Sequence, residues 1–491
     1  MTPELDLRAP CRVFIGGEWV TTAEGLTFDS ICAANGEVIA VVPDATEPDV
    51  DRAMRAAHEA YQSTWADTTA EERYELLMEL ADRIMEEEER LSMIEVVDSG
   101  AALGGDVETA ALFLRMYAGF ARQLNGKTVN LDPDRLTFTI REPFGVVSHL
   151  VPFNRPIRFV AHGVGVALAA GNTVVLKPSE YTPLSALEFA EIARQVLPPG
   201  VLNILTGHGS TCGAYMVTHP LVNKVHFRGS VLTGRRVAAI CAERSIPYTI
   251  ELGGKNPFIV YPDADISAAA SGAVRALNLG FQGQSCSSAT RLFVHEDIYD
   301  EFRDLVVKGF EQIRVGLPWD PGADTGAIVS RQQYERVLGY IQSGIEQGAK
   351  VLTGGGAVKD PELADGYFIQ PTVFETDDPT IKIATEEIFG PVTTLLRWSD
   401  EEEVLRLANS VEHGHSGSIW TSDVTRAHRV SRKLDVGVVW INDHLPRPDG
   451  MPFGPRKASG VGKEHSIDEI DWYTQEKTVM VNLADDERLV P

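Results

Sequence analysis

Cysteine is scarce in this chain. Its 491 residues include five cysteines, and no two of them are spaced as a C-x-x-C pair. An odd number of widely spaced cysteines argues against a disulfide framework or a zinc site. We therefore expect a reducing, cytoplasmic compartment and no bound metal.

Positive charge and long apolar runs are also limited. The chain has 44 Lys and Arg against 70 Asp and Glu, which gives a net charge of -26. Such an acidic surface repels nucleic acid and anionic lipid, so neither is expected as a partner. The longest apolar stretch, near 159–170, is too short to span a bilayer. The first ten residues lack the apolar core of a secretory signal.

Hydrophobic residues make up 44% of the chain, which is enough for two or three domains with substantial cores. Residues 48–99 are predicted to be helical. Between 145 and 250, short apolar strands alternate with helices that are expected to begin near Pro156, Pro183 and Ser230. This repetition is typical of an α/β fold with a doubly wound parallel sheet.

A second series of apolar strands begins at 256–261 and continues through 291–294, 392–396 and 437–441. It predicts a second α/β domain. The segments 127–141 and 476–481 fit neither sheet and resemble exposed strands, which need partners.

Cys286 is the most informative single residue. It ends the glycine-rich segment 280–286 and precedes a strand-like run, so its sulfur is expected at an exposed end of packed structure. The thiolate is the reactive form of cysteine. A lone cysteine is more often a small buried apolar residue, so a catalytic role needs support from other segments.

Two segments suit a dinucleotide. Gly229, Ser230 and Gly234 follow a strand and open a helix, where backbone N–H groups can face a phosphate. Lys177 and Glu180 follow another strand, and a carboxylate there can accept hydrogen bonds from ribose hydroxyls. A turn with a helix cap is the alternative interpretation in both places.

Three further segments carry candidate catalytic or binding groups. Asn154, between two prolines, can direct its amide at a developing oxyanion. Glu251 ends a strand at the start of the second series, as a candidate base for water. Glu387 and Phe389 place a carboxylate and an aromatic ring before a strand. The alternatives are a plain turn, a surface acid, and a loop acid before a core phenylalanine.

These segments, in this order, resemble the aldehyde dehydrogenase superfamily, from residues 14–19 to residues 452–460. Each motif alone is modestly specific, but the ordered set is highly specific. The resemblance implies a doubly wound NAD-binding domain over 1–124 and 143–250, and a second α/β catalytic domain over 251–455. It also implies a small β oligomerisation element over 125–142 and 466–485, in a homodimer or homotetramer.

The resemblance also implies roles for matching positions. Cys286 corresponds to the nucleophile, Glu251 to the general base and Asn154, with the Cys286 backbone N–H, to the oxyanion hole. The implied cofactor contacts are Lys177, Glu180, Gly229, Ser230, Gly234, Phe153, Leu252, Glu387 and Phe389. An aldehyde would be oxidised to a carboxylic acid through a thiohemiacetal and a thioester, without a metal. Glu180 would repel a 2′-phosphate, so NAD is expected rather than NADP.

The chain departs from the family at several positions. Phe153 replaces the commoner tryptophan, and Pro455 replaces a glycine. Arg228 stands where the family usually has threonine near the nicotinamide, and a bulky cation there is expected to affect cofactor placement or hydride transfer.

The region expected to line the substrate tunnel is rich in cations. Arg155, Arg158 and His162 lie near helical spacing after Asn154, and Arg447 lies in a loop expected to close the tunnel. Arginine pairs with carboxylates in a bidentate manner, so an anionic aldehyde such as a dicarboxylic semialdehyde is one predicted substrate.

Several alternatives remain open at this point. The arginines can instead pair with acids of this acidic chain. The substrate can be an uncharged aromatic or aliphatic aldehyde, with Phe159 and Phe453 as walls. A catalytically silent binding relative and a thiol esterase acting through Cys286 are two further possibilities.

Overall fold

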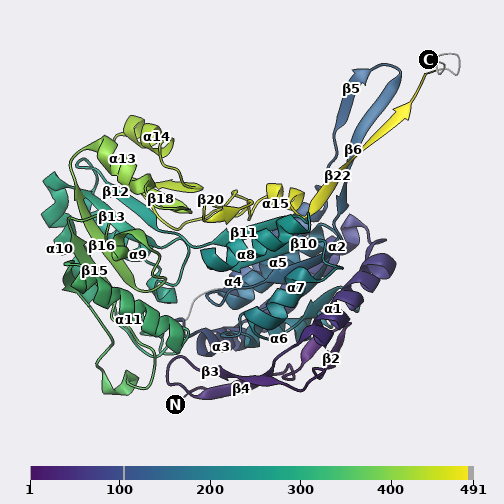
Figure 1. Cartoon of the computed structure of the whole chain (residues 1–491), viewed down its shortest axis with the longest axis horizontal. Helices are drawn as coiled ribbons and strands as arrows, with labels where there is room; N and C mark the ends of the chain where they lie inside the picture. The colour runs from purple at the N-terminus through teal and green to yellow at the C-terminus, as the bar shows by residue number, and fades with distance from the viewer. Residues whose placement is uncertain (1, 103–105, 485–491) are drawn as a thin grey trace.

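The first of two large sheets forms the body of one lobe of the molecule (Figure 1). The computed structural model describes residues 2–102 and 106–484, so the parts of the predicted domain ranges at 1, 103–105 and 485 lie outside it. Within the described residues the strand order is β2-β1-β9-β8-β7-β10-β11-β21. The five strands from β9 to β11 pair in parallel, while β1, β2 and β21 add antiparallel edges. The strands are β1 (Val13–Ile15), β2 (Glu18–Val20), β7 (Val146–Leu150), β8 (Thr173–Lys177), β9 (Leu202–Ile204), β10 (Lys224–Gly229), β11 (Tyr248–Leu252) and β21 (Gly460–Val461).

Helices cover both faces of this sheet because its central strands are apolar on both sides. Val147 and Val174 pack with α5 and α6 in one cluster, while Val146 and Val175 pack with α1 in another. This confirms the predicted doubly wound class. The helices of this lobe are α1 (Glu47–Ala60), α2 (Ala70–Glu86), α3 (Glu88–Ser99), α4 (Asp106–Ala121), α5 (Pro156–Ala169), α6 (Leu184–Ala193), α7 (Ala214–Thr218) and α8 (Val231–Glu243).

Two buried acids of α3 fix the helices that lead away from the sheet. Glu95 accepts a hydrogen bond from the backbone N–H of Ile157, and Asp98 accepts one from Leu184. Burial raises the pKa of Glu95 to about 8 and that of Asp98 to about 7. Because Ile157 lies in the first turn of α5, this contact also positions the segment around Asn154.

The second sheet forms the other lobe, with the order β14-β15-β16-β13-β12-β18-β19 (Figure 1). All its neighbours are parallel except β14 and β15. The strands are β12 (Asn256–Val260), β13 (Ala289–His295), β14 (Lys350–Thr353), β15 (Thr372–Thr376), β16 (Val392–Trp398), β18 (Ser416–Trp420) and β19 (Val438–Ile441). The helices are α9 (Ile266–Ala276), α10 (Tyr299–Glu311), α11 (Arg331–Glu346), α12 (Lys382–Thr385), α13 (Glu401–Asn409) and α14 (Val424–Ser431). The sequence predicted β12, β13, β16 and β19 but not the other three strands.

A three-stranded antiparallel sheet projects from the first lobe as a narrow arm (Figure 1). It contains β5 (Thr128–Asp132), β6 (Arg135–Pro143) and β22 (Thr474–Asn482), so the two segments that fitted neither large sheet pair with each other. The remaining β-strands and α-helix are the hairpin of β3 (Thr27–Ile31) and β4 (Val38–Pro43), the pair of β17 (His413–Gly414) and β20 (Arg456–Lys457), and α15 (Ile467–Asp471). Short 3-10 and π-helical turns cover Tyr61–Trp65, Gly209–Gly213, Leu279–Phe281, Glu296–Ile298 and Pro361–Leu363. In the described part of the chain, every helix is too short or too polar to cross a membrane.

Candidate active site

One cavity of about 370 Å³ brings most of the candidate residues together. It lies at the carboxyl ends of β7, β8, β10 and β11, which is the edge where doubly wound sheets bind ligands. The second lobe closes it with residues that precede β16. Of the predicted residues, its lining contains Phe153, Asn154, Phe159, Lys177, Glu180, Gly229, Ser230, Glu251, Leu252, Cys286, Glu387 and Phe389.

At one end of the cavity, Lys177 is buried and its Nζ donates to the carbonyl of Pro178 at 2.7 Å. The same Nζ lies 3.5 Å from Glu180 Oε2, and the Glu180 side chain is 30% exposed. Ser230 is the N-cap of α8 and its hydroxyl accepts from the backbone N–H of Thr233. Ser230 therefore has both the capping role and a position facing the cavity.

Gly234 lies one turn further into α8 and is absent from the described lining of the cavity. A Cβ at this position would lie 2.5 Å from the side chain of Leu252. The glycine therefore lets α8 pack closely on β11. It affects the cavity only indirectly, through Leu252, which is part of the lining.

Glu387 reaches the cavity from the second lobe. Its Oε1 accepts a hydrogen bond from the backbone N–H of Gly254 at 2.8 Å, and burial raises its pKa to about 7. A Cβ at Gly253 would lie 2.0 Å from the Glu387 carboxylate, so a larger residue there would displace that side chain. Phe389 meets Phe153 edge-to-face at 5.7 Å between ring centroids. These two aromatic rings form one wall.

Cys286 is half-buried and follows a short 3-10 turn, Leu279–Phe281. Its carbonyl accepts a hydrogen bond of 2.7 Å from the side chain of Asn256. The side-chain amide of Asn154 donates to the carbonyl of Gln284 at 2.9 Å, two residues before the cysteine. The segments carrying Cys286 and Asn154 are thus tied to each other and to the start of the second sheet.

Glu251 has a partner that the sequence did not reveal. Nε2 of His415 lies 2.7 Å from Glu251 Oε1, and both side chains are buried. Burial alone would raise the pKa of Glu251, but His415 and Arg228 outweigh it and lower that pKa below its ordinary value. His415 lies in the glycine- and serine-rich segment 413–418, which matches no catalytic motif.

Arg228 also lines the first cavity, and its guanidinium is held there by buried groups. Its side chain is 1% exposed and donates to Glu464 Oε2 at 2.7 Å, and the same Nη2 lies 3.0 Å from His162 Nδ1. Burial opposes its charge, but Glu464 and Glu251 more than compensate and raise its pKa. Arg228, which was expected to affect cofactor placement, is therefore held by the buried acid Glu464.

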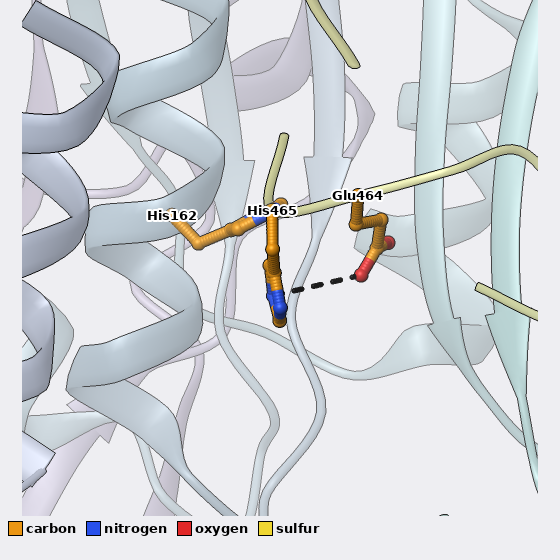
Figure 2. Close-up of side chains that lie close together, drawn as sticks. All are labelled: His162, Glu464 and His465. Atoms are coloured by element: carbon orange, nitrogen blue, oxygen red, sulfur yellow. Dashed lines mark ion pairs between the residues drawn. The ribbon is translucent and has the colours of Figure 1, made fainter. Parts of the chain in front are cut away.

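His162, Glu464 and His465 form a buried cluster whose ligand-type atoms lie within 4.8 Å of one another (Figure 2). Arg228 already donates to Glu464 and contacts His162 in this space. A guanidinium in that position repels a metal cation, so the cluster does not suit one. His162 is thus part of this internal network and is absent from the described lining of either cavity discussed here.

The three candidate substrate arginines line a second cavity of about 370 Å³. Arg155 forms an ion pair of 2.8 Å with Asp106, and Arg158 lies 3.9 Å from the same carboxylate. Burial and the neighbouring arginines hold the pKa of Arg158 well below its ordinary value. Two of the arginines therefore do pair with an acid, as the alternative interpretation expected. Both, however, share the single carboxylate of Asp106, and Arg447 adds a third cation to the cavity.

The two proposed aromatic walls differ in position. Phe159 lines the first cavity together with Cys286. Phe453 is buried, meets His415 edge-on at 5.2 Å and stacks on His465 at 5.5 Å. It therefore supports His415 from behind and does not contribute to the described lining of either cavity.

A doubly wound sheet with a cavity at its carboxyl edge is an architecture found in many dinucleotide-dependent oxidoreductases. Residues 19–479 match the sequence model of the aldehyde dehydrogenase family. The chain belongs to the aldehyde dehydrogenase family, as the sequence resemblance predicted.

Individual relatives cover nearly the whole chain. Aldehyde dehydrogenase tropH of Talaromyces stipitatus is 40% identical over 96% of this chain and 93% of its own length. The NAD+ complex of an aldehyde dehydrogenase from Bacillus cereus is 39% identical, covers 96% of both chains and has a TM-score of 0.94. PnpE of a Pseudomonas species, in complex with nicotinamide adenine dinucleotide, is 39% identical with a TM-score of 0.95 over 98% of this chain and 99% of its own.

Proposed function

We propose that this protein oxidises an aldehyde to a carboxylic acid with NAD, through a covalent adduct and a thioester on Cys286. The observation that carries the proposal is the shared cavity: it places Cys286, Glu251 and Asn154 beside the residues suited to a dinucleotide. A thiol, a carboxylate and an amide donor are the groups that attack on a carbonyl and later hydrolysis require.

The residues present fit NAD. Lys177 and Glu180 would hold the adenosine ribose, Ser230 and Gly229 at the start of α8 the pyrophosphate, and Glu387 the second ribose. The Glu180 carboxylate accepts from a 2′-hydroxyl and repels a 2′-phosphate, which favours NAD over NADP. Three of the similar solved structures are complexes with NAD. When bound, NAD supplies the hydride acceptor.

Cys286 begins the reaction as a thiolate. Its sulfur forms a bond to the aldehyde carbon, and the carbonyl π electrons move to the oxygen. The side-chain amide of Asn154 and the backbone N–H of Cys286 would donate to that oxyanion. In the structure Asn154 donates to the carbonyl of Gln284, so its N–H is already directed at the segment that carries the sulfur.

Glu251 acts in the second half of the reaction. Its lowered pKa keeps it ionised at neutral pH, so it can take a proton from water. The resulting hydroxide adds to the thioester carbon, and Cys286 leaves as a thiolate when the carboxylic acid forms. This step is hydrolysis, without transfer to coenzyme A.

We further propose that the substrate carries a carboxylate. Arg155, Arg158 and Arg447 surround the second cavity, and Asp106 neutralises only part of their charge. An anionic group in this cavity would restore the balance, which favours a semialdehyde of a dicarboxylic acid. Phe159, beside Cys286, suits the apolar part of a substrate and is what an uncharged aldehyde would contact instead.

The arm of β5, β6 and β22 is proposed to join subunits into a homodimer or homotetramer. It exposes apolar side chains, among them Leu131 at 85% and Met480 at 68%. Its outer strands also present unpaired backbone groups. Changing Met480 to Glu should lower the molar mass measured by light scattering if the arm forms the interface, and leave it unchanged if another surface does.

The test is the formation of reduced nicotinamide, followed by absorbance, with semialdehydes, aromatic aldehydes and alkanals. Turnover that disappears in Cys286→Ala supports the proposal. Binding of NAD without turnover would indicate a silent relative, and NAD-independent ester cleavage would indicate a thiol esterase.

A further inference from the structure

The segments of Cys286, Glu251 and His415 are held together by two buried polar bridges. Asn256 forms the first bridge. Its side-chain nitrogen donates to the carbonyls of Cys286 at 2.7 Å and Ser288 at 2.8 Å, and its side-chain oxygen accepts from the backbone N–H of Ser416 at 3.1 Å. One side chain thus fixes the cysteine segment relative to the segment that begins directly after His415.

Ser459 forms the second bridge. Its hydroxyl donates to the carbonyl of Gly253 at 2.7 Å and accepts from the backbone N–H of Gly414 at 3.0 Å. Gly253 lies two residues after Glu251, and Gly414 directly precedes His415. Ser459 therefore ties the backbone near Glu251 to the backbone next to His415, which fixes the position of one side chain relative to the other.

His415 is buried between these segments, and its ring rests edge-on against Phe453. Ligand-type atoms of Glu251, Cys286 and His415 all lie within 4.8 Å of one another. Burial opposes a charged ring, but Cys286 and Glu251 outweigh it and raise the pKa of His415 to about 10. Two groups that can be negative thus face one imidazole.

A further ion pair lies beside these three residues. Arg228 on β10 lies 3.9 Å from Glu251 but is bonded to Glu464 at 2.7 Å. Among the described residues, Glu387, His444, Arg447 and Glu464 also interact with His415 or with one of its two partners.

We propose that His415 is a positioning residue that carries a positive charge and holds Cys286 as a thiolate and Glu251 as a carboxylate at the same time. The three residues then form one Cys–His–Glu unit. The nucleophile is ionised before any cofactor or aldehyde binds, since the compensating charge belongs to the protein. This inference rests on the proposed role of Cys286 as nucleophile.

A neutral ring is the competing state. Nδ1 of His415 has no hydrogen-bond partner among the described residues, so a neutral imidazole that donates from Nε2 to Glu251 is also compatible with the geometry. The two states predict different reactivity of Cys286 in mild acid. Of the two states of the ring, the charged one stabilises the thiolate there and the neutral one does not.

The experiment measures alkylation of Cys286 by iodoacetamide in the protein without NAD or aldehyde, from pH 5.5 to 9, with peptide-resolved mass spectrometry. The sulfur attacks the methylene carbon and iodide leaves, so the rate reports the thiolate. We expect a nearly flat rate for Cys286 in the unmodified protein. Cys11, which is exposed, serves as an internal reference and should lose its reactivity as the pH falls.

In His415→Gln, the rate at pH 6 should fall by about two orders of magnitude relative to the rate at pH 9, as expected of a thiol with an ordinary pKa of about 8.5. The matched control is His444→Gln. His444 is also buried and its Nε2 donates to the carbonyl of Ser287, but burial lowers its pKa to about 4, so it carries no charge at neutral pH. The His444 variant should keep the flat profile.

The proposal is overturned if His415→Gln retains the flat profile, or if His444→Gln loses it as well. It is also overturned if Cys286 in the unmodified protein follows the same pH dependence as Cys11, a comparison that needs no variant. Because the measurement uses neither cofactor nor aldehyde, its outcome is independent of whether the proposed oxidation is observed.

Discussion

Arg228 and Glu251 are direct neighbours across the parallel strands β10 and β11. Nε of Arg228 lies 3.9 Å from Glu251 Oε2, while its Nη2 bonds to Glu464. The residue that departs most from the family pattern is therefore an electrostatic partner of the proposed base. It links that base to an internal acid.

Replacing Arg228 with Met should destabilise the protein by about 3 to 5 kcal/mol, because Glu464 is left buried without its partner. His415 would still oppose the effect of burial, but the loss of the Arg228 charge should raise the pKa of Glu251. Its carboxylate is then protonated at a higher pH, so the acid limb of the plot of kcat against pH should shift to higher pH. Thermal unfolding and pH-rate profiles measure the two effects. The double variant Arg228→Met with Glu464→Gln should recover stability but retain the shifted limb; an unshifted limb would show that Arg228 does not act on Glu251.

Asn256→Ala should lower both stability and activity. It removes the partners of two buried carbonyls, each worth about 1 to 3 kcal/mol, and releases the segment of Cys286 from that of His415. Asn409→Ala is the matched control: Asn409 also bridges two backbone groups, at Lys433 and Asp435, but on the surface. The control should keep the kcat of the unmodified protein. An equal loss of kcat in both variants would contradict a specific role for the Asn256 bridge.

The first sheet was predictable because its strands are continuous apolar runs between helices with clear starts. Val146–Leu150 and Thr173–Lys177 are fully buried strands, and α5 and α8 begin at or directly after the predicted Pro156 and Ser230. The second sheet was harder. β18 reads Ser-Gly-Ser-Ile-Trp and carries no apolar alternation, so its buried position reflects tertiary pairing with β12 and β19.

The same gap concealed His415, which precedes β18 directly. A single histidine in a segment rich in glycine and serine has no motif, and only the fold brings it to Glu251. His162 shows the opposite case. Helical spacing groups it with Arg155 and Arg158. The spacing alone does not show which residues pack against that side of the helix, and in the structure His162 is buried against Arg228.

Glu180→Ser should reduce the preference for NAD over NADP. The carboxylate, 30% exposed and 3.5 Å from Lys177, would repel a 2′-phosphate, while serine would not. The ratio of kcat/KM for NAD to that for NADP should fall about tenfold or more, mainly through KM. Glu191→Ser, on the following helix and paired with Arg194, is a control that should leave the ratio unchanged. An unmodified protein that uses NADP as well as NAD would contradict this interpretation of Glu180.

Binding of NAD should weaken as the pH falls through 7, if Glu387 holds a ribose. Burial raises its pKa to about 7, and a protonated carboxyl accepts hydrogen bonds less well. The Kd measured by calorimetry should increase about tenfold from pH 8 to pH 6, as expected for one group titrating at 7. Glu387→Gln should bind more weakly but without this pH dependence. If the pH dependence persists in that variant, another group is responsible.

Charge in the arginine-lined cavity should decide between acidic and uncharged aldehydes. Arg447→Met is the informative change. Removing Arg155 would leave the buried Asp106 without its ion pair, whereas removing Arg447 leaves that pair intact. We expect a rise of about tenfold or more in KM for semialdehydes that carry a carboxylate, and little change for alkanals of similar length. Asp449→Asn removes an acid that lines the same cavity and should lower the KM for the acidic substrates. Increasing salt should weaken both effects, since ions screen these charges. Equal changes for charged and uncharged aldehydes would instead assign the arginines a structural role.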